Sequence, residues 1–393
     1  MATGGVRTEA WLLSGTLLLL VGAMSRSLPI AVLGLLLLTV VLTARLWAHF
    51  SLHGVRYERH LSSERVYAGE SVQMEATLTN RKLLALPWLV IEDRFDPLLI
   101  IRGLDTPDRI GKLYELRRQI SVSWYQRVRF SYSVECPRRG YHVIGPAQLR
   151  SGDPFGLYER DQMLAETTGL LVYPKLARVE GLRIDRLFPF DSVRTGRGLL
   201  DDPMNVAGVR PYAEGDTLRQ VHWRASARST GLQSKVWRPT TEPGVVIFLD
   251  LTSAEHAWQG VDVEAVEKAI STAGTVIHQV HGARRALGLY VNGLRSGTNQ
   301  KIRIGLAKGE QAFEAAMETL ARVYPYPNMP MAELMHSERH SLPVGATVVV
   351  VTAVRLPAVD EQVEIYRRGG RHVLVLDVGR PTPATAPVLE QAR

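Results

Sequence analysis

Hydrophobic positions follow a continuous pattern at the start of the chain. Residues 11–24 and 29–44 are almost wholly apolar, and a short polar turn separates them. The second run is long enough to cross about 30 Å of hydrocarbon, and the first is somewhat short for this. The pattern predicts a transmembrane helical hairpin over residues 1–50. The alternative is a signal peptide, in which Arg7 is the charged region and the first run is the apolar core.

Cations around this hairpin predict its orientation. Only Arg26 lies in the turn, whereas Arg7 precedes the first run and three arginines follow the second run closely, Arg45, Arg56 and Arg59. Because cations beside membrane spans favour the cytoplasmic side, we expect a bacterial inner-membrane protein with its soluble domains in the cytoplasm. The single cysteine, Cys136, cannot form an intrachain disulfide and so implies no oxidising compartment.

An alternating pattern of apolar and polar residues follows. The stretches that alternate are residues 56–60, 71–79 and 128–134. Several short strands without a helical pattern predict a small β-sandwich-like domain over residues 51–175. The apolar run 83–91 contains Pro87, so we expect it at a sheet edge. We expect Trp88 and Trp124 to pack in the core or at a corner.

Apolar runs and helical patterns alternate from residue 242 onward. Strands are predicted over residues 244–250, 286–291, 346–352 and 371–377. Helices are predicted over residues 261–281, 311–323 and 359–368. This order predicts an α/β domain over residues 241–379, in which helices cover both faces of a parallel sheet. The proline-containing residues 380–393 are expected to form a flexible tail.

A segment rich in cations and turn formers lies between these two domains, within residues 176–240. Its densest part, residues 208–229, also contains an aromatic residue and a histidine. Gly215 and Asp216 predict a turn, with Asp216 capping a helix over residues 217–227.

Three interpretations of this segment are open. In the first, a fork for a carboxylate or phosphate is formed by Arg210, Arg219, Arg224 and Arg228. In the second, a nucleophilic triad is formed by Asp216, His222 and Ser226. In the third, Arg219 and His222 bond to backbone carbonyls while Trp223 packs in a core. The candidates for partner or anion binding are therefore Arg210, Asp216, Arg219, His222, Trp223, Ser226 and Arg228.

The same segment resembles the signature of the family called domain of unknown function 58. The matching residues are Gly208, Arg210, Tyr212, Gly215, Asp216, Arg219, His222, Trp223, Ser226, Ala227 and Arg228. Residues 153–157 match a second element, which we interpret as a turn with Phe155 as an aromatic plug at the close of the sandwich. Residues 172–174 and the membrane hairpin also match, so the resemblance spans nearly the whole chain. It implies a MoxR-type AAA+ ATPase as the partner, whereas the family's biochemical role is poorly defined.

The C-terminal domain resembles a von Willebrand factor A domain. Many such domains hold a divalent cation with a D-x-S-x-S loop and an Asp after a later strand. Here Asp250 and Thr252 match the loop, but Ala254 replaces the second hydroxyl and Thr352-Ala353 lacks the acid. We therefore expect weak metal binding or none, with Asp250 and Thr252 as the weak candidate ligands. Without a metal, Asp250 would serve as a cap at a strand end. No glycine-rich phosphate-binding loop is present in the sequence, and no cofactor is expected.

The net charge of +8 indicates anionic partners, such as lipid headgroups or acidic protein surfaces. No compact basic block or nucleic-acid module occurs, so nucleic acid is not expected. We therefore expect a membrane-anchored, non-enzymatic scaffold that presents its C-terminal domain and signature to a partner, in complex assembly or envelope-related processes. The alternatives are a binder of anionic lipid or envelope precursor, and a hydrolase that uses His222.

Overall fold

The structure, a computed structural model, describes residues 5–102, 108–110, 113–177, 201–213, 216–239, 244–256, 258, 260–297, 300–343 and 345–379. The chain divides into two compact units, Met1–Tyr173 and Pro174–Arg393, and each is described by itself. The predicted tail, residues 380–393, lies outside the described residues, as do Gly215 and residues 178–200.

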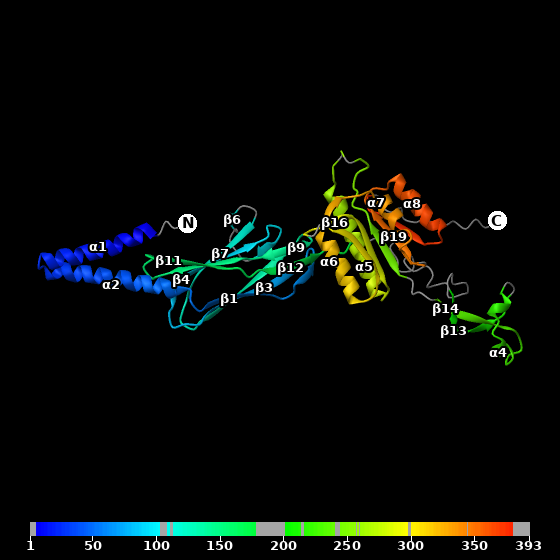
Figure 1. The fold of residues 1–393 in the computed structure, drawn as a ribbon, viewed down its shortest axis with the longest axis horizontal. Coiled ribbons are helices and arrows are strands. Elements are labelled where there is room, and N and C mark those ends of the chain that lie inside the picture. The colour runs from blue at the N-terminus through cyan, green and yellow to red at the C-terminus, as the bar shows by residue number, and fades with distance from the viewer. Residues whose placement is uncertain are drawn as a thin grey trace. The chain divides into compact units, whose positions relative to one another are not determined.

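Two helices open the first unit and lie side by side, α1 (Gly5–Met24) and α2 (Leu28–Ser51) (Figure 1). Glycines allow their backbones to approach closely. A Cβ on Gly22 would lie 2.4 Å from the backbone nitrogen of Ala31. The predicted helix pair is confirmed. By length and composition α2 can cross a membrane, whereas the apolar part of α1, Ala10–Met24, is shorter.

Three β-sheets make up the rest of this unit, and their strands pair antiparallel except for residues 65–67, which pair in parallel with residues 171–173. Two of the sheets have the strand orders β1-β3-β8-β5 and β11-β10-β4-β7-β6, and a third is β2-β12-β9. Their buried side chains, among them Met74 and Leu89, form one core. The strands are β1 (Val55–Leu61), β2 (Arg65–Tyr67), β3 (Ser71–Asn80), β4 (Leu86–Phe95), β5 (Ile100–Arg102), β6 (Asp108–Ile110), β7 (Leu113–Val122), β8 (Arg127–Glu135), β9 (Gly140–Ile144), β10 (Ala147–Gly152), β11 (Glu159–Leu164) and β12 (Thr168–Tyr173).

The edge position expected for the run 83–91 is wrong, because β4 lies inside its sheet between β10 and β7. Pro87 is tolerated there because it falls where the register with β7 shifts, between Leu86 and Leu89. Trp88 is half-buried, as expected, and its Nε1 donates a hydrogen bond to the Asp153 carbonyl (3.0 Å).

Two other aromatic residues of this unit were expected to pack and do not. Trp124 is exposed in the turn between β7 and β8, and Phe155 is exposed in the loop between β10 and β11. The latter turn is instead held by Asp153, whose buried carboxylate accepts the N–H groups of Phe155 (2.8 Å) and Tyr158 (2.6 Å). Side chains that the turn does not need for its shape are therefore left in solvent.

The second unit contains a mixed sheet with the order β17-β16-β15-β19-β20. Strands β16, β15, β19 and β20 are parallel, whereas β17 is antiparallel at the edge and β18 pairs antiparallel with β16. Helices α5 and α6 cover one face, and α7 and α8 cover the other (Figure 1). The elements are β15 (Val245–Leu249), α5 (Val263–Gly282), β16 (Leu287–Arg295), β17 (Lys301–Ala307), α6 (Glu310–Arg322), β18 (Val323–Pro327), α7 (Met331–Glu338), β19 (Thr347–Thr352), α8 (Pro357–Arg368) and β20 (Val373–Asp377).

The predicted strands and helices of this α/β region are confirmed. The expectation of a wholly parallel sheet is corrected by β17 and β18, which the sequence pattern did not reveal. Lys301–Ala307 alternates exposed positions with buried or half-buried ones, as an edge strand does. Its polar residues make the segment resemble a loop in the sequence.

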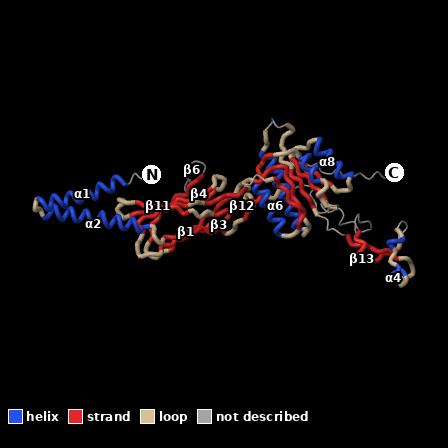
Figure 2. Tube along the Cα trace, in the orientation of Figure 1, coloured by secondary structure: helices blue, strands red, loops and turns tan. Residues whose placement is uncertain are grey.

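The signature segment forms a separate antiparallel hairpin of β13 (Asp201–Pro211) and β14 (Gln233–Pro239). Between these strands lie the 3₁₀ turn η1 (Leu218–Gln220) and the four-residue helix α4 (Trp223–Ser226) (Figure 2). The helix expected over residues 217–227 is therefore wrong. Val221 pairs with Ser234 in an isolated bridge, and the His222 N–H donates to the Gln233 carbonyl (2.7 Å). Pairing with β14 thus interrupts the helix at its centre.

Candidate functional site

Asp216 is the centre of the polar contacts in the hairpin. Its carboxylate accepts hydrogen bonds from Arg210 Nη2 (2.6 Å), Ser234 Oγ (2.9 Å) and the Ala213 N–H (3.1 Å). The bond from Arg210 is the largest of the effects that lower the pKa of Asp216 from 3.8 to about 2. The expected role of Asp216 as a helix cap is wrong, because this carboxylate braces the turn between the strands.

His222 and Ser226 connect α4 to the strands through backbone groups. His222 Nδ1 accepts the Ala225 N–H (3.1 Å) and so caps α4. Ser226 Oγ donates to the His222 carbonyl (3.1 Å) and accepts the Gln233 N–H (2.8 Å). The triad is therefore not assembled: hydroxyl and imidazole bond to backbone groups, and Asp216 bonds to Arg210 and Ser234. The backbone interpretation holds for His222 with one change, since its ring accepts an N–H instead of bonding to a carbonyl.

The four arginines of the expected fork do not act together. Arg210 is paired with Asp216 (2.6 Å), which neutralises it. Arg224 and Arg228 are exposed and have no ion-pair partner among the residues that the structure describes. The side chain of Arg219 lies outside the described part of the chain.

Apolar side chains are the exposed feature of the hairpin. Leu218 is 70% exposed and Trp223 is 63% exposed, so the expected core packing of Trp223 is wrong. Val209, Tyr212 and Leu232 are also exposed in part. This hairpin therefore exposes large apolar side chains at five positions, two of them by more than 60%.

The second candidate site lies at the carboxyl ends of the parallel strands. Asp250 is fully buried after β15, and its Oδ1 accepts the Thr252 N–H (2.9 Å), which confirms a cap at this strand end. Oδ1 also accepts Asn292 Nδ2 (2.7 Å), and Oδ2 accepts Thr352 Oγ1 (3.2 Å). Asn292 Oδ1 accepts the Leu251 N–H (2.8 Å), which fixes the orientation of the amide.

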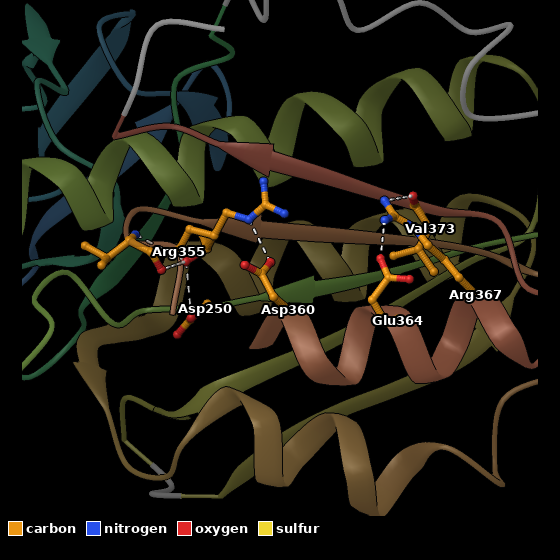
Figure 3. A network of polar contacts seen from close by, with 8 residues as sticks. Asp250, Arg355, Asp360, Glu364, Arg367 and Val373 are labelled. Carbon is orange, nitrogen blue, oxygen red and sulfur yellow. Dashed lines mark hydrogen bonds and ion pairs between the residues drawn. The ribbon is translucent and has the colours of Figure 1, made fainter. Parts of the chain in front are cut away.

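These donors are all neutral. Burial raises the pKa of Asp250, and the hydrogen bonds oppose this shift. Arg355, the cation that follows β19, turns to Asp360 on α8 instead (2.7 Å; Figure 3). The described residues contain no group of three or more His, Cys, Asp or Glu side chains that could hold a metal ion. Amide and hydroxyl donors here contact the oxygens that a cation would need.

Two residues of these sites escaped the sequence analysis. Ser234 is a common residue in a strand, and its sequence neighbours give no indication that it contacts Asp216. Asn292 lies in β16 beside β15, at the edge of the sheet where ligands are expected. A polar residue that follows the buried run Leu287–Val291 is a signal that could have identified it.

The two candidate sites lie largely within a segment that is similar to a known protein family. Residues 208–388, which include the hairpin from Gly208 onward and the Asp250 network, match the family described as "Protein of unknown function DUF58". Residues 208–388 belong to the DUF58 family. The chain is also 24% identical to the uncharacterized protein YeaD of Bacillus subtilis, over 86% of this chain and 79% of YeaD. The resemblance to the DUF58 family is thus confirmed, and the description of this family assigns it no function.

Solved structures with a similar arrangement of elements match only a small part of the chain. A CARDB domain of Pyrococcus furiosus, in complex with di-metal ions, is 11% identical and covers 30% of this chain and 91% of its own, with a TM-score of 0.22. A cohesin of Archaeoglobus fulgidus is 9% identical over 30% of this chain and 91% of its own, with a TM-score of 0.21. Scores this low do not establish a common fold.

Proposed function

We propose that the chain is a membrane-anchored, non-catalytic adaptor whose DUF58 hairpin docks a partner protein. The observation that supports this most is that polar and apolar side chains of the hairpin have different environments. The polar groups of Asp216, His222 and Ser226 bond to other side chains or to the backbone, whereas Leu218 and Trp223 face solvent. A reactive site needs free polar groups, and a docking site needs exposed apolar ones.

The remaining parts of the proposal concern anchoring and architecture. The pair α1–α2 anchors the chain in a bacterial inner membrane, with the soluble parts in the cytoplasm. The antiparallel sheets form a sandwich-like spacer, and the mixed sheet is a von Willebrand factor A-like domain whose cation site is replaced by the amide of Asn292. The partner is an AAA+ ATPase of MoxR type, and both the hairpin and the sheet's carboxyl edge are presented to it.

Affinity capture from native membranes in mild detergent, with and without ATP, tests this proposal. We expect the wild-type chain to recover an AAA+ ATPase in an ATP-dependent manner. The double variant Leu218→Ser, Trp223→Ser is expected to lose it, since exposed aromatic anchors commonly carry most of the binding energy. Trp124→Ala, which removes an exposed tryptophan from the other unit, is the matched control and is expected to retain the partner.

Two results would overturn the docking proposal. One is the absence of any AAA+ ATPase from the wild-type eluate, and the other is equal recovery by the double variant and the wild type. Recovery of lipid alone would favour the second candidate function, binding of anionic lipid or an envelope precursor. That candidate is supported by Arg224 and Arg228, two exposed arginines of this segment without an ion-pair partner among the described side chains.

A further inference from the structure

One end of the β-sheet unit is fixed against the end of α2. Ser51, the last residue of α2, is fully buried, and Leu52 belongs to the core of the sheets. Arg160 of β11 donates to the ring Nδ1 (3.0 Å) and the carbonyl (3.3 Å) of His49. The chain then enters β1 directly (Figure 1). These contacts place the helix end and one end of the sheets together.

Strand register shows which loops share this end. Val55, which starts β1, pairs with Asn80, which ends β3, and Leu86 of β4 pairs with Val122 of β7. Gly152, at the end of β10, follows Ser151, which pairs with Leu89. The loops that follow these strand ends, residues 81–85, 123–126 and 153–158, therefore all lie at the α2 end.

Exposed apolar side chains gather in these three loops. The four most exposed large apolar residues described between α2 and residue 173 are Leu83 (73%), Trp124 (66%), Tyr125 (64%) and Phe155 (64%). We call them the α2-end patch. Toward the opposite end of the strands, the exposed apolar residues Leu98 (41%), Ile100 (50%) and Met163 (58%) are each less exposed. Apolar exposure is thus highest where the chain leaves α2.

Hydrogen bonds hold the loops of the patch in place. The Arg81 N–H donates to the Gly54 carbonyl (2.9 Å), and the Tyr125 N–H donates to the Lys82 carbonyl (3.2 Å). The buried side chain of Asn80 donates to the carbonyls of Leu84 (2.9 Å) and Ser123 (3.0 Å) and so joins two loops. These hydrogen bonds fix the backbone of the loops, so the shape of the loops does not depend on the exposed side chains.

Charge around the loops 81–85 and 123–126 is positive, whereas the loop 153–158 contains the buried Asp153 and is followed by the exposed Glu159. Arg81 and Arg127 are exposed and have no ion-pair partner among the described residues. Residues 80–87 and 122–128 contain no Asp or Glu. Lys82 is half-buried, and burial lowers the pKa of its ammonium to about 8. Amphipathic aromatic rings with neighbouring cations are the side chains that favour the headgroup region of a bilayer.

We propose that the α2-end patch lies in the headgroup region of the bilayer that α2 enters, and that Arg81 and Arg127 favour anionic lipid there. The β-sheet unit is then held against the membrane surface at two points, the helix end and the patch. This inference rests on the proposed membrane anchoring. We assign the bilayer as the partner that covers the α2-end patch, because the patch adjoins the end of α2, and α2 has the length and composition of a membrane span.

Depth measurements on the full chain in phosphatidylcholine vesicles containing phosphatidylglycerol test this. A spin label is attached at Trp124→Cys or Phe155→Cys, and its collision rates with oxygen and with a water-soluble nickel complex are compared. The native Cys136 is buried, and burial raises the pKa of its thiol to about 11, so the introduced thiol reacts selectively. Leu98→Cys is the matched control at the opposite end, and Leu36→Cys reports on α2.

We expect the oxygen-to-nickel ratio at positions 124 and 155 to be several-fold higher than at position 98. Arg81→Glu with Arg127→Glu is expected to lower the ratio toward that in phosphatidylcholine alone. Ratios at 124 and 155 equal to that at 98, with Leu36 in lipid, would overturn the inference and leave anchoring intact. A label at Leu36 in water would instead overturn the anchoring itself. Protection of position 124 only when a second protein is added would assign the patch to a protein.

Discussion

Asp216 in the hairpin and Asp250 at the end of β15 are held in opposite ways. Asp216 is paired with the cation Arg210, and its pKa falls to about 2. Asp250 is buried, bonds only to neutral donors, and its pKa is raised. The two carboxylates belong to the same DUF58 match, and both accept hydrogen bonds from other side chains. Their difference shows that this family segment uses one residue type as a charged brace in one place and as a buried acceptor in another.

The largest expected effect comes from removing the buried acceptor. Asp250→Ala would remove the acceptor of the Thr252 N–H and the closest acceptor of the Asn292 amide, which keeps only a longer contact with Thr252 Oγ1 (3.4 Å). The Thr352 hydroxyl would keep its bond to the Val354 carbonyl (2.7 Å). We expect the local free energy of opening β15 and β19 to fall by about 3 kcal/mol. Hydrogen–deuterium exchange of peptides covering these strands measures this in the full chain.

The isosteric variant Asp250→Asn is the control, because it retains one acceptor oxygen and is expected to lose less. Equal exchange in wild type and Asp250→Ala would show that the carboxylate is not what satisfies these donors, and the comparison of the two aspartates would fail.

Acid is expected to separate the two aspartates. Since the pKa of Asp216 is lower in the folded hairpin, its stabilisation is complete above about pH 4 and is lost as the pH falls toward about 2. Asp250 has a raised pKa, so protonation at low pH relieves the cost of its burial. Exchange rates corrected for pH are expected to rise below pH 4 in residues 208–216 of the wild type, and not in Asp216→Asn. A parallel pH response of the variant would contradict the pairing with Arg210.

A smaller effect is expected inside the hairpin. Ser226→Ala removes the acceptor of the Gln233 N–H, which is half-buried, and is expected to cost about 1 kcal/mol of local stability. Thr230→Ala, which removes the hydroxyl of an exposed threonine four residues further on, is the control and is expected to change little. Exchange of the Gln233 amide distinguishes them. If both variants behave alike, the hydroxyl of Ser226 has a role other than joining α4 to β14.

Added Mg²⁺ is expected to leave the hydrogen exchange of β15 unchanged. The Asn292 amide lies 2.7 Å from Asp250 Oδ1, where a cation would compete with it. Exchange of β15 should therefore be the same in Mg²⁺ and in chelator. Asn292→Asp places a second carboxylate at this position and is expected to make the exchange rate Mg²⁺-dependent. Protection of the wild type by Mg²⁺ would contradict the neutral network.

Much of the fold could be predicted from the sequence, and the sites could not. Buried strands such as Thr347–Thr352 have continuous apolar runs, and α5 has a clear apolar stripe, so local patterns identify them. The hairpin differs because its backbone is set by a distant partner. Val221 is extended because it pairs with Ser234, and this overrides the helical preference of its neighbours. Asp216 contacts Ser234 and Asp250 contacts Asn292, across 18 and 42 residues of chain, and no spacing along the sequence encodes these contacts.

The central claim is that the polar DUF58 signature builds a shape and that exposed apolar residues dock the partner. Its most direct test is the dissociation constant of the captured AAA+ ATPase for the wild-type chain and for Trp223→Ser. We predict a loss of about 2 kcal/mol, roughly thirtyfold in affinity, with hydrogen exchange of the hairpin unchanged. Unchanged affinity of Trp223→Ser, together with a hydrolytic activity that His222→Ala abolishes, would contradict the account.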